Sequence, residues 1–138
     1  MKPAYVVDAS VVIRMLRADH PQQFAQATAL FKRAEAGELT LEISDVTAAE
    51  IVWVLTSFYK VPRQDVADAL LKLLGNPGVV AVNAPWLTKA LELFRDINVD
   101  ATDCFLASSA VTQKRALISF DRDYRKFPGL QWRTPEKV

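Results

Sequence analysis

The chain has 138 residues, 51% of them hydrophobic, which is enough to bury one core, and we expect a single domain over residues 1–138. Seventeen Lys and Arg against sixteen Asp and Glu exclude both the strongly basic balance of many nucleic-acid-binding domains and an acidic tail. The only cysteine cannot form an internal disulfide, and the amino-terminal apolar run is too short for a signal peptide or a membrane span. We therefore expect a cytoplasmic protein without a membrane partner.

Strand-like and helix-like segments alternate along the chain. Short apolar runs rich in β-forming residues indicate strands, and apolar residues at helical spacing indicate helices. Turn residues separate these segments, most clearly in the cluster Gly75-Asn76-Pro77-Gly78. The predicted strands are residues 4–7, 39–43, 79–82, 116–119 and 130–133. The predicted helices are residues 11–17, 21–36, 46–59, 62–74, 86–97 and 101–114.

The alternation predicts how the strands pair. Strands separated by helices favour parallel pairing through right-handed crossovers, so we predict an α/β fold with three layers, α/β/α, around a central, mainly parallel sheet. In such sheets the binding crevice lies outside the carboxyl ends of the strands. Asp8 and Asp121 each follow a predicted strand, and Glu50 and Asp103 lie in the first turns of helices that begin near the same edge.

Four carboxylates gathered in one crevice would repel one another. Two unit charges about 5 Å apart cost on the order of 3 kcal/mol at an effective dielectric constant of about 20. A cation would offset this repulsion, and oxygen ligands without a thiolate or imidazole cluster favour Mg²⁺ or Mn²⁺ over Zn²⁺. Because such ions activate water and neutralise charge on phosphorus, the acids predict a site for phosphodiester hydrolysis.

Each acid also has a purely structural interpretation. Asp8 could cap the helix that begins near Ser10, and Glu50 completes a capping-box pattern with Thr47. Either interpretation would explain the residue without a metal. The joint placement of the acids at one edge of the sheet is therefore the signal, rather than any single residue.

Two further acids adjoin the third and fourth positions. Asp100 stands three residues before Asp103 and is a candidate helix cap, while Asp103 lies in the first turn, where the helix dipole favours an anion. Asp121 and Asp123 flank Arg122, and either could cap the short turn that follows. Asp100 and Asp123 are therefore accessory candidates, and their division of roles with Asp103 and Asp121 is open.

Other chemistries have weaker support in the sequence. The only histidine, His20, lies in a predicted loop beside Pro21, and the four glycines form no phosphate-binding loop. An aspartate-nucleophile phosphatase is one alternative, but that chemistry needs a second Asp two residues after the first, where Ser10 stands. A non-catalytic module whose acids attract a basic peptide is the other alternative.

Four short motifs in order resemble those of the PIN-domain family and, within it, the VapC-type toxins of bacterial and archaeal toxin–antitoxin pairs. The resemblance spans nearly the whole chain. The motifs are Tyr5-Val6-Val7-Asp8-Ala9-Ser10, Ala49-Glu50-Ile51-Val52-Trp53-Val54-Leu55, Val99-Asp100-Ala101-Thr102-Asp103-Cys104-Phe105-Leu106-Ala107 and Ser119-Phe120-Asp121-Arg122-Asp123-Tyr124.

The resemblance implies a metal-dependent endoribonuclease that is inhibited by a cognate antitoxin and commonly dimerises, with transfer RNA and ribosomal RNA among the substrates of such toxins. Asp8, Glu50, Asp103 and Asp121 match the acidic positions of the family. Our hypothesis is that Asp8 and Asp103 bind the principal metal directly. Asp121 would contribute directly or through water, and Glu50 would complete the site or orient the attacking water.

Two groups of polar residues complete the prediction. Ser10 and Ser119 could orient water or metal, although each is also an ordinary cap or strand-exit residue. Basic side chains near the predicted site could contact RNA phosphates, and truncating one of them should weaken binding across sequences and reduce its salt dependence. The candidate phosphate contacts are Arg14, Arg17, Arg115 and Arg122.

Overall fold

The computed structural model describes residues 2–138 and shows an α/β fold in which helices alternate with parallel strands. Over these residues the helices are α1 (Ala9–Leu16), α2 (Pro21–Glu35), α3 (Asp45–Ser57), α4 (Arg63–Leu74), α5 (Ala84–Asp96) and α6 (Ala101–Thr112), with short 3-10 helices η1 (Arg122–Lys126) and η2 (Pro135–Lys137). The strands are β1 (Ala4–Val6), β2 (Thr40–Ile43), β3 (Val79–Ala81), β4 (Leu117–Ile118) and β5 (Trp132–Arg133). The predicted α/β class with parallel strands is confirmed.

The first three strands form a parallel sheet in the order β1-β2-β3. Its register places Leu41 beside Val79, and both side chains are buried. The next position along the sheet places Glu42 between Val6 and Val80, which are 76% and 44% exposed. Because successive side chains of a strand point to opposite faces, one face of this sheet packs into the core and the other is open.

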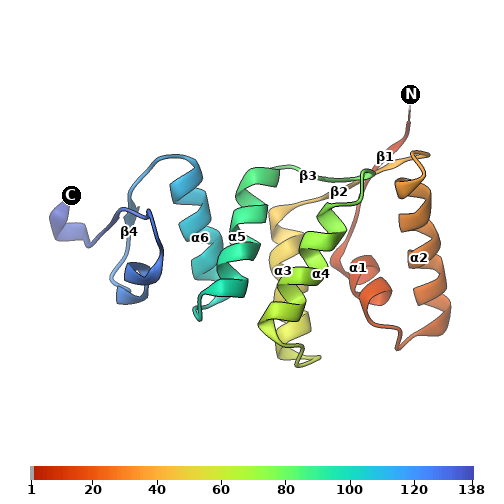
Figure 1. The fold of residues 1–138 in the computed structure, drawn as a ribbon, viewed down its shortest axis with the longest axis horizontal. Helices are drawn as coiled ribbons and strands as arrows, with labels where there is room; N and C mark the ends of the chain where they lie inside the picture. Colours follow the sequence, from red (N-terminus) through yellow and green to blue (C-terminus); the bar gives the residue numbers. More distant parts are fainter. Residues whose placement is uncertain (1) are drawn as a thin grey trace.

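The last two strands form a sheet of their own. β4 pairs with β5 in parallel and is not joined to β1, unlike the one central sheet that the sequence predicts. α4 packs on α5, and α5 packs on α6, so the chain after β3 runs along the long axis of the molecule. Figure 1 shows the result: β4 and β1 lie toward opposite ends, with α5, α3 and α4 between α6 and α1.

The starts of the helices follow local sequence signals. His20 caps α2 by accepting a hydrogen bond on Nδ1 from the backbone N–H of Gln23 at 3.2 Å, and Pro21 takes the first helical position, as predicted. Ser44 caps α3 by accepting a hydrogen bond from the N–H of Thr47.

Cys104 is buried in the core, where desolvation raises its pKa to about 12. None of the helices described over residues 2–138 is long and apolar enough to cross a membrane.

Arg63, the first residue of α4, holds the connection between α5 and α6. Its guanidinium donates hydrogen bonds to the carbonyl oxygens of Phe94, Ile97 and Val99. The same group lies 4.0 Å from the centre of the Phe94 ring, which adds a cation–π contact. One side chain therefore satisfies three carbonyl groups at and after the carboxyl end of α5.

Arg63→Met should destabilise the fold by about 2–3 kcal/mol, because carbonyl groups that now accept charge-assisted hydrogen bonds lose their donor. The measurement is urea unfolding followed by circular dichroism. Arg33→Met is the matched control, since Arg33 is an exposed residue whose ion pair with Glu38 spans 3.7 Å, and such pairs contribute about 0–1 kcal/mol. Equal stability of the two variants would contradict the structural role of Arg63.

Candidate metal centre

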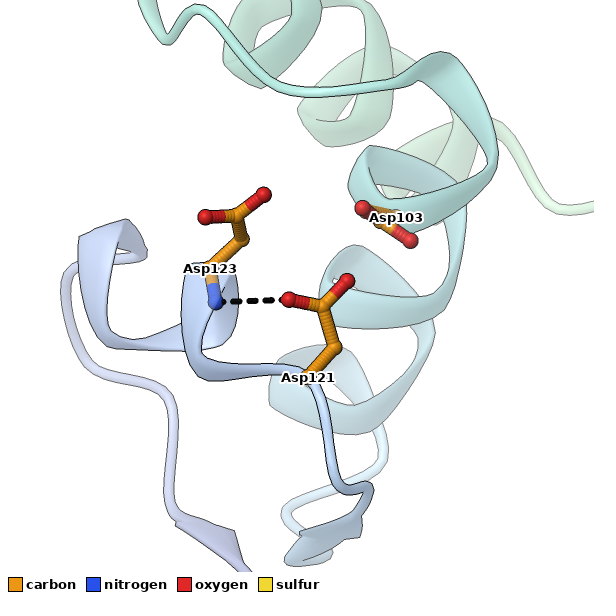
Figure 2. Close-up of side chains that lie close together, drawn as sticks. All are labelled: Asp103, Asp121 and Asp123. Carbon is orange, nitrogen blue, oxygen red and sulfur yellow. Dashed lines mark hydrogen bonds between the residues drawn. The ribbon is translucent and has the colours of Figure 1, made fainter.

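Three carboxylates meet where α6 faces η1. Asp103 lies in the first turn of α6, Asp121 is the residue before η1, and Asp123 lies within η1. Each offers an oxygen atom, and these atoms lie within 4.8 Å of one another. Figure 2 shows the side chains converging from α6 and from the start of η1, two elements that β4 separates along the chain. Of the four predicted acids, Asp103 and Asp121 are brought together, and the accessory candidate Asp123 joins them.

Local hydrogen bonds fix the loop that carries two of these acids. The backbone N–H of Asp121 donates to Ser119 Oγ at 3.0 Å, and Asp121 Oδ1 accepts from the N–H of Asp123 at 2.8 Å. Trp132 Nε1 donates to the carbonyl of Ser119 at 2.9 Å, which ties the loop to β5. Asp121 therefore caps η1, as its structural interpretation predicted, and Ser119 orients Asp121.

Tyr124 belongs to the site, although sequence analysis assigned it no role. Its ring is buried, and its hydroxyl donates a hydrogen bond to Asp103 Oδ1 at 3.1 Å. Burial, then the bond to Asp103, raises the pKa of Tyr124 to about 12, so the hydroxyl keeps its proton at neutral pH. The feature of the sequence that could have indicated this role is the position of Tyr124 at the end of the fourth motif, three residues after Asp121.

The electrostatics of the cluster favour a bound cation. Desolvation by burial raises the pKa of Asp103, the hydrogen bond from Tyr124 opposes this, and the charges of Asp121, Asp100 and Asp123 raise it further. A set of three carboxylates suits a hard divalent ion such as Mg²⁺ or Mn²⁺. Asp103, Asp121 and Asp123 would hold such an ion, which when bound supplies activation of water and neutralisation of phosphate charge.

Asp8 and Glu50 lie outside this group of three. Asp8 follows β1 and caps α1, with Oδ2 accepting a hydrogen bond from the N–H of Ser10 at 3.1 Å. It is exposed, and its pKa is lowered by hydrogen bonding to Ser10. The carboxylate therefore faces solvent and caps α1, as its structural interpretation predicted.

Glu50 stands exposed in the second turn of α3 rather than the first. The predicted capping box with Thr47 is wrong, since the helix begins five residues earlier, at Asp45, and Ser44 is its cap. The acids do not all reach one crevice within this chain because the carboxyl ends of β1 and β4 belong to two sheets. Asp8 and Glu50 remain candidate site residues on the proposal developed below.

Comparison with known proteins identifies the family. The family model described as PIN domain matches residues 5–130. The chain belongs to the PIN-domain family. No curated protein sequence matches it. A solved structure of VapBC2 from Rickettsia felis, bound to a DNA fragment from their promoter, is similar to this PIN domain with 15% identity and a TM-score of 0.38. The match covers 95% of this chain and 98% of that chain.

Asp100 occupies the N-cap position of α6 in this PIN domain, but its side chain makes no capping hydrogen bond. It lines a cleft of about 660 Å³ between α3 and α6, together with Trp53 and Arg63. The predicted cap by the Asp100 side chain is therefore wrong. Burial is the main cause of the raised pKa of Asp103, and the negative charge of Asp100 adds to it.

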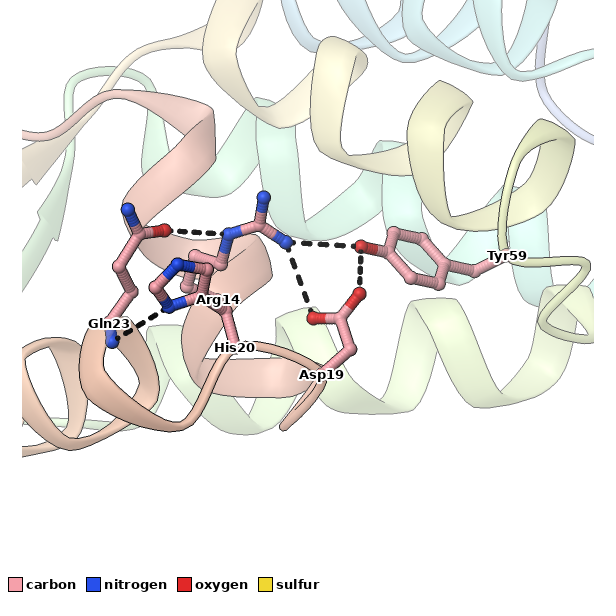
Figure 3. Close-up of polar contacts among 5 residues, drawn as sticks. All are labelled: Arg14, Asp19, His20, Gln23 and Tyr59. Carbon is pink, nitrogen blue, oxygen red and sulfur yellow. Dashed lines mark hydrogen bonds and ion pairs between the residues drawn. The ribbon is translucent and has the colours of Figure 1, made fainter.

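Two of the four candidate phosphate contacts are held by other side chains. Arg14 donates to Gln23 Oε1, to Asp19 Oδ1 and to the hydroxyl of Tyr59, and that hydroxyl donates to Asp19 Oδ2 at 2.8 Å (Figure 3). The guanidinium of Arg17 lies 5.1 Å from the centre of the Tyr59 ring. These two residues join α1 to α2 and to the end of α3.

The other two candidates, Arg115 and Arg122, are exposed beside β4 and in η1. Arg122 accepts a hydrogen bond on its carbonyl oxygen from Arg125. In η1, Lys126 forms an exposed ion pair with Asp123 at 3.6 Å. Arg122, Arg125 and Lys126 thus lie in the same short helix as Asp123.

Asp103→Asn should make the metal-free PIN domain more stable at pH 7. The pKa of Asp103 in the folded state is raised above 3.8. The folded state therefore loses stability as pH rises from 3.8 through the raised pKa, and the loss persists at higher pH. The variant lacks this cost and can still accept the hydrogen bond from Tyr124. Urea unfolding in chelator should show a stability gain at pH 7 that shrinks below pH 3.8. A parent that is more stable than the variant at pH 7 would contradict the expected sign.

Proposed function

We propose that this PIN domain is a metal-dependent endoribonuclease whose cluster of Asp103, Asp121 and Asp123 binds Mg²⁺ or Mn²⁺. The convergence of three carboxylates from two elements, with oxygen atoms within 4.8 Å, carries the proposal. PIN domains are generally nucleases and typically use a divalent metal, which agrees with this ligand set. Hydrolysis of an RNA phosphodiester needs an activated water and a cation beside the attacked phosphate, and the carboxylate cluster suits both needs.

The test is cleavage of purified RNA by the purified chain. Transfer RNA, ribosomal RNA and a random RNA pool are incubated with Mg²⁺ or Mn²⁺, and fragments are mapped at nucleotide resolution. We expect endonucleolytic products that disappear on chelation and return when the metal is restored. The absence of cleavage in every pool with either metal would contradict the proposal.

We further propose that the chain is the toxin of a toxin–antitoxin pair, that it acts in the cytoplasm and that it forms a homodimer. The four ordered motifs that resemble those of VapC-type toxins support this. Expression of the chain alone should arrest growth, and coexpression of the small protein encoded beside it should relieve the arrest. Asp8→Asn should also relieve it, because Asp8 is the first acid of those motifs. Growth unaffected by the parent chain would count against the toxin role while leaving the nuclease assay to judge the chemistry.

A further inference from the structure

Each of the two sheets ends in a strand whose outer edge is unpaired within residues 2–138. β1 pairs with β2 alone, and β4 pairs with β5 alone. An unpaired edge presents backbone N–H and C=O groups to which another strand can bind. Both sheets are parallel, so β1 and β4 can join edge to edge in one parallel sheet of five strands. Within one chain they lie toward opposite ends of the molecule (Figure 1).

Large apolar side chains are exposed at both edges. In β1, Val6 is 76% exposed and Tyr5 is 53% exposed. Ile118 in β4 is 47% exposed, and Phe120, which follows β4, is 78% exposed. Clusters of exposed apolar side chains mark interaction sites. Joining the edges would bury apolar surface from both sheets.

The segments that flank the two edges differ in net charge. Residues 38–50, which include β2 beside β1, contain Glu38, Glu42, Asp45 and Glu50 and no Lys or Arg. Residues 114–137, which include β4 and β5, contain seven basic side chains against three acidic ones. Because Glu42 is the register partner of Val6, the negative charge lies next to the open strand. This complementarity favours a second copy of the same chain as the occupant of each edge.

The acidic motif residues are also divided between the two sheets. Asp8 lies two residues after the end of β1, and Glu50 lies on α3. The cluster of Asp103, Asp121 and Asp123, by contrast, adjoins β4. Parallel pairing of β1 with β4 would place their carboxyl ends at the same edge of the joint sheet. Asp8 would then approach Asp121 from the neighbouring strand.

We propose that two copies of this chain pair reciprocally, β1 of each against β4 of the other, so that Asp8 and Glu50 of one copy complete the carboxylate cluster of its partner. A two-fold axis produces two such pairings and two composite sites per dimer. The role of the composite site rests on the proposed nuclease function, whereas the strand pairing does not depend on it.

A cross-linking experiment tests the pairing without any activity assay. Chains carrying Val6→Cys are mixed with chains carrying Ile118→Cys, or Leu117→Cys for the neighbouring register, and then oxidised. Neighbouring strands lie about 4.8 Å apart, within the range of about 4.4–6.8 Å between Cα atoms that a disulfide spans. We expect a covalent dimer in the mixture and none from either variant alone, since the native Cys104 is buried. The pairing is overturned if neither mixture yields a covalent dimer.

Val6→Lys tests the same edge by light scattering. The parent should have twice the mass of one chain, and the variant should be a folded monomer by circular dichroism, because lysine at an edge strand opposes pairing. Ala29→Lys, at an exposed position of α2, adds the same charge away from both edges and should remain a dimer. A monomeric parent, or a Val6→Lys variant that stays dimeric, overturns the proposal.

Complementation tests the composite site. Asp8→Asn and Asp121→Asn chains, each inactive alone, are unfolded, mixed and refolded together. In a reciprocal dimer one of the two sites in each mixed pair has both native acids, so activity should return to about a quarter of the parent's. No recovery from an active parent overturns the composite site. If the parent cleaves no RNA while the cross-link forms, the nuclease proposal fails and the pairing stands.

Discussion

Asp121→Asn should reduce metal-dependent RNA cleavage by at least about 100-fold, because the substitution removes one negative ligand from the cluster. The amide keeps an oxygen that can accept the hydrogen bond from the N–H of Asp123, so η1 should persist. The variant should also bind Mn²⁺ more weakly in calorimetric titration. Cleavage rates and the titration together separate loss of metal from loss of structure.

The control for Asp121→Asn is Asp65→Asn, which makes the same chemical change at an exposed carboxylate in the first turn of α4. This control should cleave RNA and bind Mn²⁺ as the parent does. If Asp121→Asn also retained the parent's cleavage rate and metal affinity, the cluster would not be the metal centre.

Gly78→Ala should destabilise the protein by about 3 kcal/mol or more, because β3 approaches α2 closely at this residue. A Cβ atom at Gly78 would lie 2.2 Å from the carbonyl oxygen of Ala34 and 2.4 Å from its carbonyl carbon. Backbone atoms cannot yield as a flexible side chain does, so α2 and β3 must move apart. Urea unfolding would measure the loss of stability.

Gly75→Ala is the matched control from the same turn. Its nearest contact would be the carbonyl oxygen of Lys72 at 3.2 Å, and its backbone φ of −79° suits alanine. This variant should remain close to the parent in stability. A Gly78→Ala variant as stable as Gly75→Ala would show that the approach of α2 to β3 is looser than the structure indicates.

Local sequence determined the elements of this PIN domain and the identity of its acids. Each strand and helix predicted from periodicity is present, with bounds that differ by at most two residues, because backbone preference and side-chain period act over a few neighbouring residues. The capping role of Asp8 and the helix start at Pro21 were readable for the same reason. Asp103 and Asp121 were also found from sequence, as acids placed at a helix start and a strand exit.

Tertiary structure alone decided which of the four predicted acids meet. Pairing of strands far apart in sequence depends on how α4, α5 and α6 pack, and no local pattern encodes that packing. In the packed structure β4 pairs with β5 instead of β1. Asp103 and Asp121 therefore lie together, whereas Asp8 lies at the other sheet. The packing also buries Tyr124 against Asp103, a contact that depends on how η1 packs against α6.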